Sequence, residues 1–195
     1  MARIVATEFI SLDGVIEDPG GSEDFKHGGW SFQFSRGEDG DRFKLDETRE
    51  SDAMLLGRKT YEGFAAAWPE RDGEFADIFN GMPKYVVSTT LRDPEWTNST
   101  VIGGDDVVAE VAKLRAGPDA MIVVHGSAQL VQTLLQHDLV DELRLMVFPV
   151  VLGSGKRLFG PTGDMKTLRL ASSQVVGDGV AIMVYEPASD ASAGA

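Results

Sequence analysis

Cysteine is absent from this chain of 195 residues, which excludes disulfide bonds, thiolate metal sites and cysteine nucleophiles. No uninterrupted run of ~18 apolar residues occurs, so no membrane-spanning helix is expected. The first residues, MARIVATEFISLDG, lack the long apolar stretch and cleavage motif of a signal peptide. We therefore expect a cytoplasmic protein with no membrane partner.

Basic residues are scarce, because 18 Lys and Arg stand against 31 Asp and Glu and give a formal net charge of -13. General nucleic-acid binding relies on phosphate neutralisation by Lys and Arg. We therefore expect no nucleic-acid partner. A local phosphate site is still allowed wherever cations gather, so a small-molecule partner remains compatible with the charge.

Several common motifs are also missing. No GxGxxG follows the first expected strand, and neither GxSxG nor HExxH occurs. The segment LGSGKRLF superficially resembles a P-loop, but Val150 stands where the first glycine is required and Arg157 replaces the Ser or Thr. The three histidines lie too far apart for a local metal motif, so we expect no metal.

Strand-like and helix-like segments alternate along the chain, which predicts a three-layer α/β fold with a mostly parallel sheet and helices on both faces. The last two strands, joined near Gly177-Asp178-Gly179, are expected to form an antiparallel hairpin at one edge. We expect a single domain over residues 1–187 and a disordered tail over residues 188–195. The expected strands are 3–10, 53–57, 84–90, 99–103, 120–126, 141–153, 166–176 and 180–187, and the main expected helices are 41–51, 60–68, 105–117 and 127–139, with a short one near 75–82.

The stretch LLGRKTYEGF, 55–64, predicts an anion site. A buried strand ends at Gly57, and a helix begins near Thr60 with amide hydrogens that lack helical partners. Arg58 adds a forked donor set suited to phosphate, beside Lys59. The alternative is a threonine cap with two solvated cations.

Two other junctions repeat this design. Ser88 and Thr89 follow one strand, and Gly126 and Ser127 stand between another strand and its helix. Ligands of open α/β sheets bind beyond the carboxyl ends of the strands. The three junctions together favour a nucleotide cofactor, although Ser and Gly are also common connectors.

The same junctions carry a family resemblance. LLGRKTYEGF, YVVSTT and VVHGSAQLVQTLL resemble segments of dihydrofolate reductases. SLDGVIE and FPVVLGSGKRLF are similar to the reductase (C-terminal) domain of the bifunctional riboflavin-biosynthesis deaminase–reductase and its stand-alone bacterial relatives. The similarity runs from about Arg3 to Glu186. The deaminase half, whose zinc motif needs cysteines, is absent.

The resemblance implies an NADPH cofactor and assigns its contacts. Arg58, Ser88 and Thr89 would face the adenosine 2′-phosphate, and Gly57, Lys59 and Thr60 would lie along the adenosine and pyrophosphate. The pyrophosphate would be held at the fourth helix, where the cofactor-binding candidates are His125, Gly126, Ser127, Ala128 and Gln129. For His125, packing is favoured over a pocket contact.

Catalytic and substrate residues are less marked, since the cofactor supplies the hydride. Asp13 is a candidate at the nicotinamide end, or else part of an Asp-Gly turn. Asp41 has the spacing of the dihydrofolate reductase carboxylate that holds the pterin, although Asp46 and Glu47 are alternatives and all are compatible with solvated charges. The substrate-pocket candidates are Phe9, Ile16, Phe148, Pro149, Leu152 and Gly153, with Lys156 and Arg157 near a substrate phosphate or simply solvated.

The resemblance therefore predicts an NADPH-dependent oxidoreductase of riboflavin biosynthesis. It would transfer a hydride to a pterin-like or 5-amino-6-(ribosylamino)uracil-type substrate, as a 5-amino-6-(5-phosphoribosylamino)uracil reductase does. The alternative is a non-catalytic NADP-binding or regulatory protein that has kept the cofactor cleft, and a weaker third reading is a reductase of small carbonyl compounds. The long apolar strand after Asp141 and the final hairpin also predict a homodimer.

Overall fold

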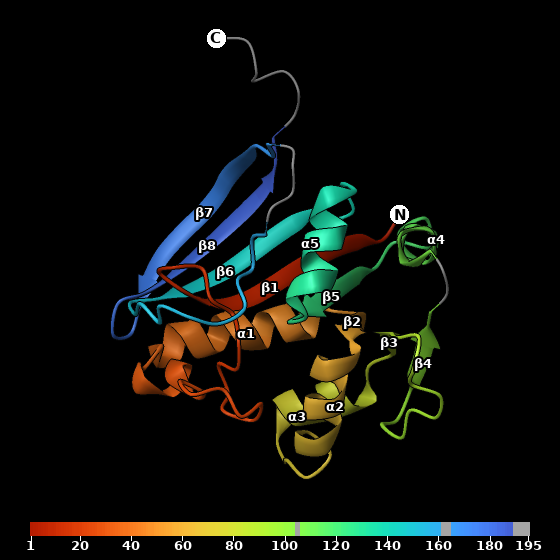
Figure 1. Ribbon diagram of the computed structural model, residues 1–195, viewed down its shortest axis with the longest axis horizontal. Helices are drawn as coiled ribbons and strands as arrows, with labels where there is room; N and C mark the ends of the chain where they lie inside the picture. Colours follow the sequence, from red (N-terminus) through yellow and green to blue (C-terminus); the bar gives the residue numbers. More distant parts are fainter. Residues whose placement is uncertain (104–105, 161–164, 189–195) are drawn as a thin grey trace.

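A computed structural model describes residues 1–103, 106–160 and 165–188. One sheet of eight strands runs through it in the order β4-β3-β2-β5-β1-β6-β8-β7 (Figure 1). The strands are β1 (Arg3–Ser11), β2 (Ala53–Gly57), β3 (Lys84–Val87), β4 (Ser99–Ile102), β5 (Met121–His125), β6 (Glu142–Phe148), β7 (Leu168–Val176) and β8 (Val180–Pro187). The helices are η1 (Trp30–Gln33), α1 (Gly37–Glu50), α2 (Arg58–Ala67), α3 (Glu74–Gly81), α4 (Val107–Arg115) and α5 (Ala128–Gln136).

The predicted sheet topology is confirmed. Strands β4, β3, β2, β5, β1 and β6 pair in parallel, whereas β8 is antiparallel to both β6 and β7. The β7–β8 hairpin turns through residues 177–179, as the glycines there predicted. The parallel strands therefore present their carboxyl ends at one common edge.

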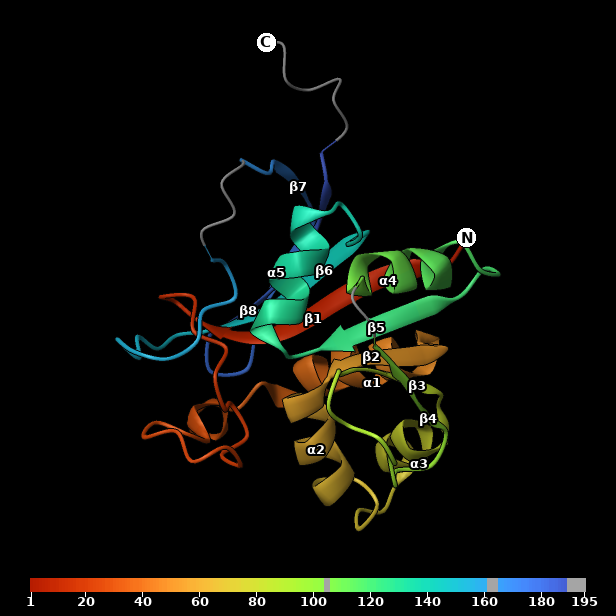
Figure 2. The same cartoon turned by 45° about the vertical axis from the view of Figure 1, so that its right-hand side comes forward.

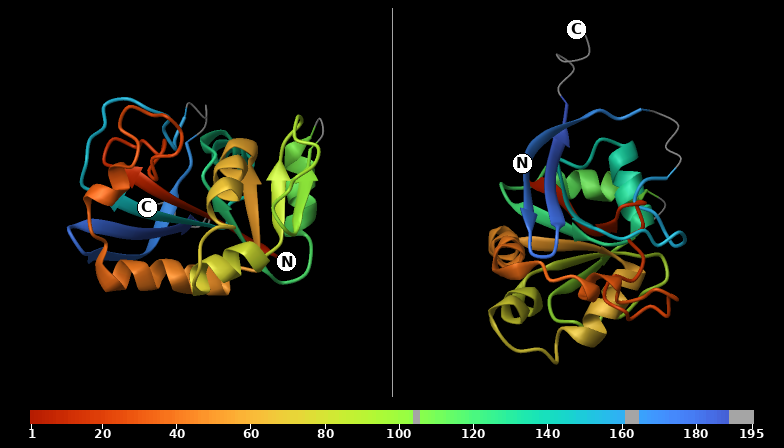
Figure 3. Two further views of the ribbon diagram at one scale, coloured as in Figure 1. Left: turned by 90° about the horizontal axis from the view of Figure 1, so that it is seen from below. Right: turned by 90° about the vertical axis from the view of Figure 1, so that its left-hand side faces the viewer.

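Helices cover both faces of the sheet, so the fold has three layers. Helices α4 and α5 lie on one face, and α1, α2 and α3 lie on the other (Figure 2). Seen from below, α1 and α3 extend across the strands (Figure 3, left). Among the described residues, no helix combines the length and the apolar character that a membrane span needs.

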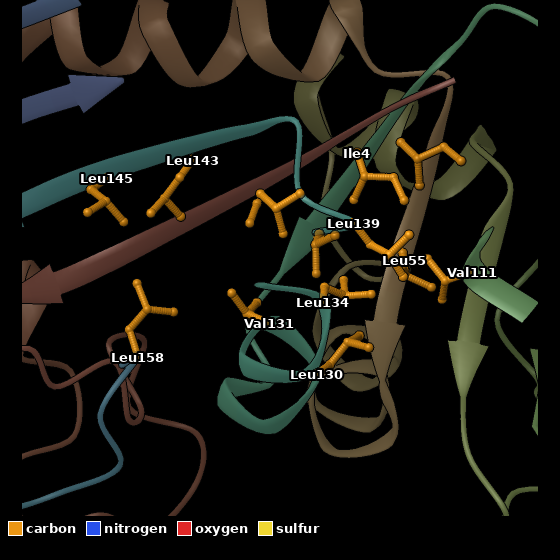
Figure 4. Packing of buried hydrophobic residues seen from close by; sticks show 14 of the residues in the cluster. Ile4, Leu55, Val111, Leu130, Val131, Leu134, Leu139, Leu143, Leu145 and Leu158 are labelled. Carbon is orange, nitrogen blue, oxygen red and sulfur yellow. The ribbon is translucent and has the colours of Figure 1, made fainter. Parts of the chain in front are cut away.

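Strand β2 shows why the central strands read as continuous apolar runs. Leu55 packs into the core under α4 and α5, whereas Met54 and Leu56 pack into the core under α2 and α3. A strand buried on both faces needs apolar side chains at every position. The core on the α4–α5 side is shown in Figure 4, and it includes Ile4, Leu55, Val111, Leu130, Val131, Leu134, Leu139, Leu143, Leu145 and Leu158.

Several predicted boundaries were wrong, and three of these errors have a clear local setting. The strand expected over 141–153 ends at Phe148, because Pro149 has no N–H to continue the ladder. The strand expected to reach Thr90 ends at Val87, where Ser88 turns the chain. Helix α1 begins at Gly37 rather than Asp41, and its first turn carries two acidic residues that suit the helix dipole.

Candidate cofactor site

Two helix N-termini meet at the carboxyl edge of the sheet. Helix α2 follows β2 directly, and α5 follows β5 after Gly126 and Ser127. The Thr60 and Ser127 hydroxyls lie 3.0 Å apart and share a hydrogen bond. Neither helix has a side-chain cap on its first amides. Two sets of unpartnered N–H groups with positive dipole ends thus stand side by side, which is an arrangement suited to a polyanion.

Glycine is required where these two helices approach. A Cβ on Gly57 would lie 2.1 Å from Ser127 Oγ. A Cβ on Gly126 would lie 2.8 Å from Thr60 Oγ1, and Gly126 also has a φ of +61°. Any side chain at either position would push the two turns apart. Backbone amides can therefore come closer to a ligand here than side chains would permit.

The strand β3 adds hydroxyl groups to the same edge. Ser88 is buried, and its Oγ accepts hydrogen bonds from the N–H groups of Thr90 (3.1 Å) and Leu91 (2.9 Å). The Ser88 hydroxyl also lies 3.4 Å from the Thr90 hydroxyl, and either of the two can donate. Thr89 is exposed beside it. A Cβ on Gly103, at the end of β4, would lie 2.0 Å from the Ser88 carbonyl oxygen, so these strand ends are packed together.

The cations predicted for the site lie at its surface. Arg58 is the first residue of α2 and pairs with Glu62 one turn later, at 2.8 Å from Nη1 to Oε1. The Arg58 side chain is 41% exposed, so it can turn towards a ligand at little cost. Lys59 is exposed, Ala128 is half-buried and Gln129 is exposed at the start of α5.

Asp13 holds two loops together. Its carboxylate accepts hydrogen bonds from Ser11 Oγ (2.7 Å) and from the N–H groups of Leu152 (3.1 Å) and Gly153 (2.9 Å). These bonds, with the Ser11 hydroxyl foremost, lower the pKa of Asp13 to about 2. A carboxyl with that pKa carries no proton at neutral pH, so its position suits a clamp between the β1 turn and the loop after β6.

The substrate-pocket candidates lie around the end of β1. Phe9 is half-buried and contacts Phe148 with ring centroids 5.3 Å apart. Phe148 is fully buried and also packs edge-on against Trp30. Ile16 is buried, whereas Pro149 and Gly153 lie in the exposed loop that follows β6. Phe9 is thus the aromatic candidate with a surface open to a ligand.

The charged candidates outside the strand ends are paired with neighbours. Asp41 is exposed on α1 and bonds Arg36 at 2.6 Å, and the Arg36 guanidinium lies 5.4 Å from the centre of the Phe9 ring. Lys156 pairs with Glu17 at 3.0 Å. Arg157 donates to the Asp13 carbonyl oxygen. Asp41 is therefore connected to the β1 region through Arg36 and does not contact the N-termini of α2 and α5.

A buried ionisable cluster lies beneath the site, and sequence reasoning named only Glu47 of it, as an alternative to Asp41. Lys44 of α1 donates to Thr7 Oγ1 of β1 at 2.9 Å and pairs with Glu47 one turn later. On the next β1 residue, the Glu8 carboxyl is also buried. Burial raises the pKa of Glu8 to about 8, although the Lys44 charge and a hydrogen bond from the Gly126 N–H lower it. Glu8 therefore holds a proton over much of the neutral range.

His125 serves as packing rather than as a charged ligand. Its ring lies 5.2 Å from the Phe79 ring and 5.8 Å from the Phe64 ring. Burial, with the Lys44 charge nearby, lowers the pKa of His125 to about 3. The ring is thus neutral at physiological pH and fixes the residue before Gly126.

One signal for the missed cluster was present in the sequence. In the strand RIVATEFI, Glu8 shares a face with Ala6 and Ile10, both of which are core residues. A carboxylate at an apolar position of a two-residue period indicates a buried acid. Its partners on α1 lie 36 residues or more along the chain, and no local pattern connects them.

Comparison with known families identifies the family of this chain. The model of the RibD C-terminal domain matches residues 2–182. The chain belongs to the RibD C-terminal domain family. Protein YyaP of Bacillus subtilis, which is uncharacterised, is 30% identical over 188 residues and aligns with 94% of both chains.

Solved structures place this family member among dihydrofolate reductase-like folds. A candidate riboflavin biosynthesis protein from Shewanella sp. PV-4 superposes with a TM-score of 0.77 at 23% identity, covering 96% of this chain and 99% of that one. Dihydrofolate reductase from Enterococcus faecalis, solved with NADP(H) and RAB-propyl, gives 0.58 at 14% identity, with coverage of 96% and 97%. At these identities the likeness establishes the fold.

Proposed function

We propose that this protein is an NADPH-dependent reductase. The single observation that carries the proposal is the meeting of the α2 and α5 N-termini, where Gly57 and Gly126 leave no room for side chains. Membership of the RibD C-terminal domain family supports a reductase-like activity. The printed description of the Enterococcus neighbour, a reductase complexed with NADP(H), supports the choice of cofactor.

The residues at the sheet edge fit this cofactor chemically. The uncapped amides of α2 and α5 and the Ser127 turn would hold the pyrophosphate. Arg58 and the Ser88 hydroxyl would hold the 2′-phosphate, because a phosphate dianion favours an arginine fork with hydroxyl donors. When bound, the cofactor supplies a hydride. The protein's share is to orient the reacting groups in a dry cleft, which requires few acid–base residues.

We propose a pterin-like or 5-amino-6-(ribosylamino)uracil-type heterocycle as the substrate class. Phe9 offers a half-buried aromatic surface at the end of β1, where a planar ring can stack. Arg36 beside it offers donors to a polar substituent, and Asp41 is within its reach as an acceptor partner. The reductase of riboflavin biosynthesis is the activity for which this combination is best suited.

Turnover separates this function from its alternative. Purified protein mixed with NADPH and each candidate substrate should lose absorbance at 340 nm if it is a reductase. The alternative, a non-catalytic NADP-binding protein, predicts that NADPH raises the thermal unfolding midpoint while no candidate is reduced. Absence of both effects, at millimolar cofactor, would contradict the proposal.

We also propose that the protein forms a homodimer through its β7 edge. Strand β7 pairs with β8 on one side, and its other edge pairs with no strand among the described residues. Leu170 and Val175 are 46% and 74% exposed on it. An open edge carrying apolar side chains favours pairing with a second copy. Sedimentation at several concentrations tests this: a monomer mass throughout would contradict the dimer.

A further inference from the structure

Glu8 lies directly beneath the turn that connects β5 to α5. In the sheet register Thr7 pairs with His125, which sets Glu8 beside Gly126. The Gly126 N–H lies close enough to the Glu8 carboxyl to lower its pKa. The next residue, Ser127, is the N-cap of α5 and bonds Thr60 of α2. The Glu8 carboxyl is thus connected through Gly126 to the N-termini of both α2 and α5.

The Glu8 carboxyl has too few hydrogen-bond partners to stabilise a negative charge. It is 6% exposed, and its Oε1 atom is buried without a hydrogen-bond partner. An ionised carboxylate in that position would leave an oxygen unsolvated, which is costly. Such a group beneath an anion site implies more than packing, because an apolar side chain would fill the space without this cost.

The groups that face Glu8 leave its charge largely uncompensated. Helix α5 carries no ionisable residue, and the β6 residue opposite Glu8 is Leu145. On the other face, α1 provides Lys44 and Glu47, which pair with each other. His125 of β5 is neutral at physiological pH. The interactions that favour the charged carboxylate are therefore the Lys44 charge, which is the larger, and the Gly126 N–H, and burial outweighs both.

We propose that Glu8 is a positioning residue for the cofactor, fixing the Gly126–Ser127 turn while uncharged and weakening the hold of that turn on a pyrophosphate once it ionises. The inference rests on the proposed NADPH function. A neutral carboxyl accepts the Gly126 N–H bond and adds no charge below the pyrophosphate. An ionised carboxylate repels the pyrophosphate across a medium of low dielectric constant.

The sign of the effect follows from linkage. A bound pyrophosphate favours the protonated form of Glu8, so binding raises the pKa of this carboxyl above its value of about 8 in the free protein. Binding near pH 8 therefore takes up a fraction of a proton. NADPH affinity should be highest below pH 8 and should fall by about tenfold between pH 7 and pH 9.5, if binding raises this pKa by about one unit.

The test compares NADPH dissociation constants of the wild type and Glu8→Gln at pH 7, 8, 9 and 9.5. Glutamine mimics the neutral acid in shape and keeps the acceptor for Gly126. We expect the wild-type constant to rise about tenfold and that of the variant to stay within about twofold. Adenosine 2′-monophosphate, which lacks the pyrophosphate, is the matched probe and should show no Glu8-dependent change.

Calorimetry of the wild type provides a readout that needs no variant. At pH 8, NADPH titrations in buffers of different ionisation enthalpy should show proton uptake. Equal pH dependence in the wild type and Glu8→Gln, or a wild type with neither pH dependence nor proton uptake, would overturn the inference while leaving NADPH binding intact. No NADPH binding by the wild type at any pH would overturn the proposed function, and the inference with it.

Discussion

Gly57 and Ser127 are packed so closely that a methyl group on Gly57 would lie 2.1 Å from Ser127 Oγ. These residues belong to different strand–helix junctions, 70 positions apart in the chain. Their contact turns two separate helix N-termini into one site. The closeness of this contact, rather than either junction alone, determines where backbone amides converge.

Substitution of Gly57 by alanine should open this junction. We expect NADPH affinity to fall by about tenfold or more and the free energy of unfolding to fall by about 1–3 kcal/mol, since the neighbouring turn must move. Fluorescence titration and urea denaturation measure the two effects.

Gly63 provides the matched control within the same helix. A Cβ there has only Ser22 Oγ within 4 Å, at 3.9 Å. Gly63→Ala should therefore raise the free energy of unfolding by about 0.5–1 kcal/mol. Its NADPH affinity should equal that of the wild type. Wild-type affinity in Gly57→Ala would show that the close contact does not shape the site.

Arg58 is expected to distinguish NADPH from NADH. Charge-assisted hydrogen bonds contribute about 1.5–3 kcal/mol, so Arg58→Ala should reduce the ratio of the two affinities about tenfold to a hundredfold. Glu62→Gln should raise NADPH affinity slightly, because it releases Arg58 from its pair. Both ratios are measured by competitive titration.

Arg71 is the control for this change of charge. It lies over the Trp68 ring, with its guanidinium 4.4 Å from the ring centre, beyond the end of α2. Arg71→Ala removes one positive charge at a position distant from the N-termini of α2 and α5. It should leave the ratio of the NADPH and NADH affinities unchanged. If Arg58→Ala behaves like Arg71→Ala, the 2′-phosphate is bound elsewhere.

The strand ends of the site were predictable from the sequence, because their cause is local. The apolar run before Gly57 and the run before Gly126 each indicate a buried strand, and parallel alternation places both ends at one edge. The expected fold class and closing hairpin were confirmed for the same reason.

The buried acids were not predictable in this way. The pKa of Glu8 depends on Gly126 and Lys44, which approach it only after folding. Lys44 and Glu47 have the three-residue spacing of any exposed helical pair, and the sequence does not reveal which face of α1 points inward. The end of β6 differs from these cases, because its cause is local: Pro149 follows Phe148 and has no N–H to continue the ladder.

The pair of Lys44 and Glu47 should contribute strongly to stability. Burial raises the pKa of Glu47, but the charge and hydrogen bond of Lys44, together with smaller contributions that include Arg144, outweigh burial, and the net pKa is lowered. Lys44→Met removes the hydrogen-bonded partner of this buried carboxylate and leaves only Arg144, whose Nη1 lies 3.5 Å from Glu47 Oε2, so it should cost about 3–5 kcal/mol of unfolding free energy. The double variant with Glu47→Gln should recover part of that loss. Urea denaturation at pH 7 measures both.

The pH dependence of this pair follows from the lowered pKa of Glu47. Its contribution is complete above the unfolded value of 4.5 and is lost as the pH falls through the folded value. The wild type should therefore lose more stability than Glu47→Gln between pH 6 and pH 3. Asp39→Asn, in an exposed pair with Arg42 on the same helix, should change stability by less than about 0.5 kcal/mol. Parallel curves for the wild type and Glu47→Gln would contradict this account.

Glu8 should have the opposite effect on stability, because its pKa is raised. The pKa is 4.5 when unfolded and about 8 when folded, so folding favours the protonated form. The resulting stabilisation is complete below pH 4.5 and is lost as the pH rises through 8. Glu8→Gln cannot ionise, and it should exceed the wild type by roughly 2–5 kcal/mol at pH 9 while differing little at pH 4.5.

Urea denaturation of the unliganded protein across this pH range measures the difference without any cofactor. Glu38→Gln, an exposed substitution in the first turn of α1, is the control for loss of one carboxylate and should follow the wild-type curve. A constant difference between Glu8→Gln and the wild type from pH 4.5 to pH 9 would mean that Glu8 has the same pKa in both states. The carboxyl beneath the Gly126–Ser127 turn would then already be ionised at neutral pH, and its burial would have to be offset by the Gly126 N–H and Lys44 alone.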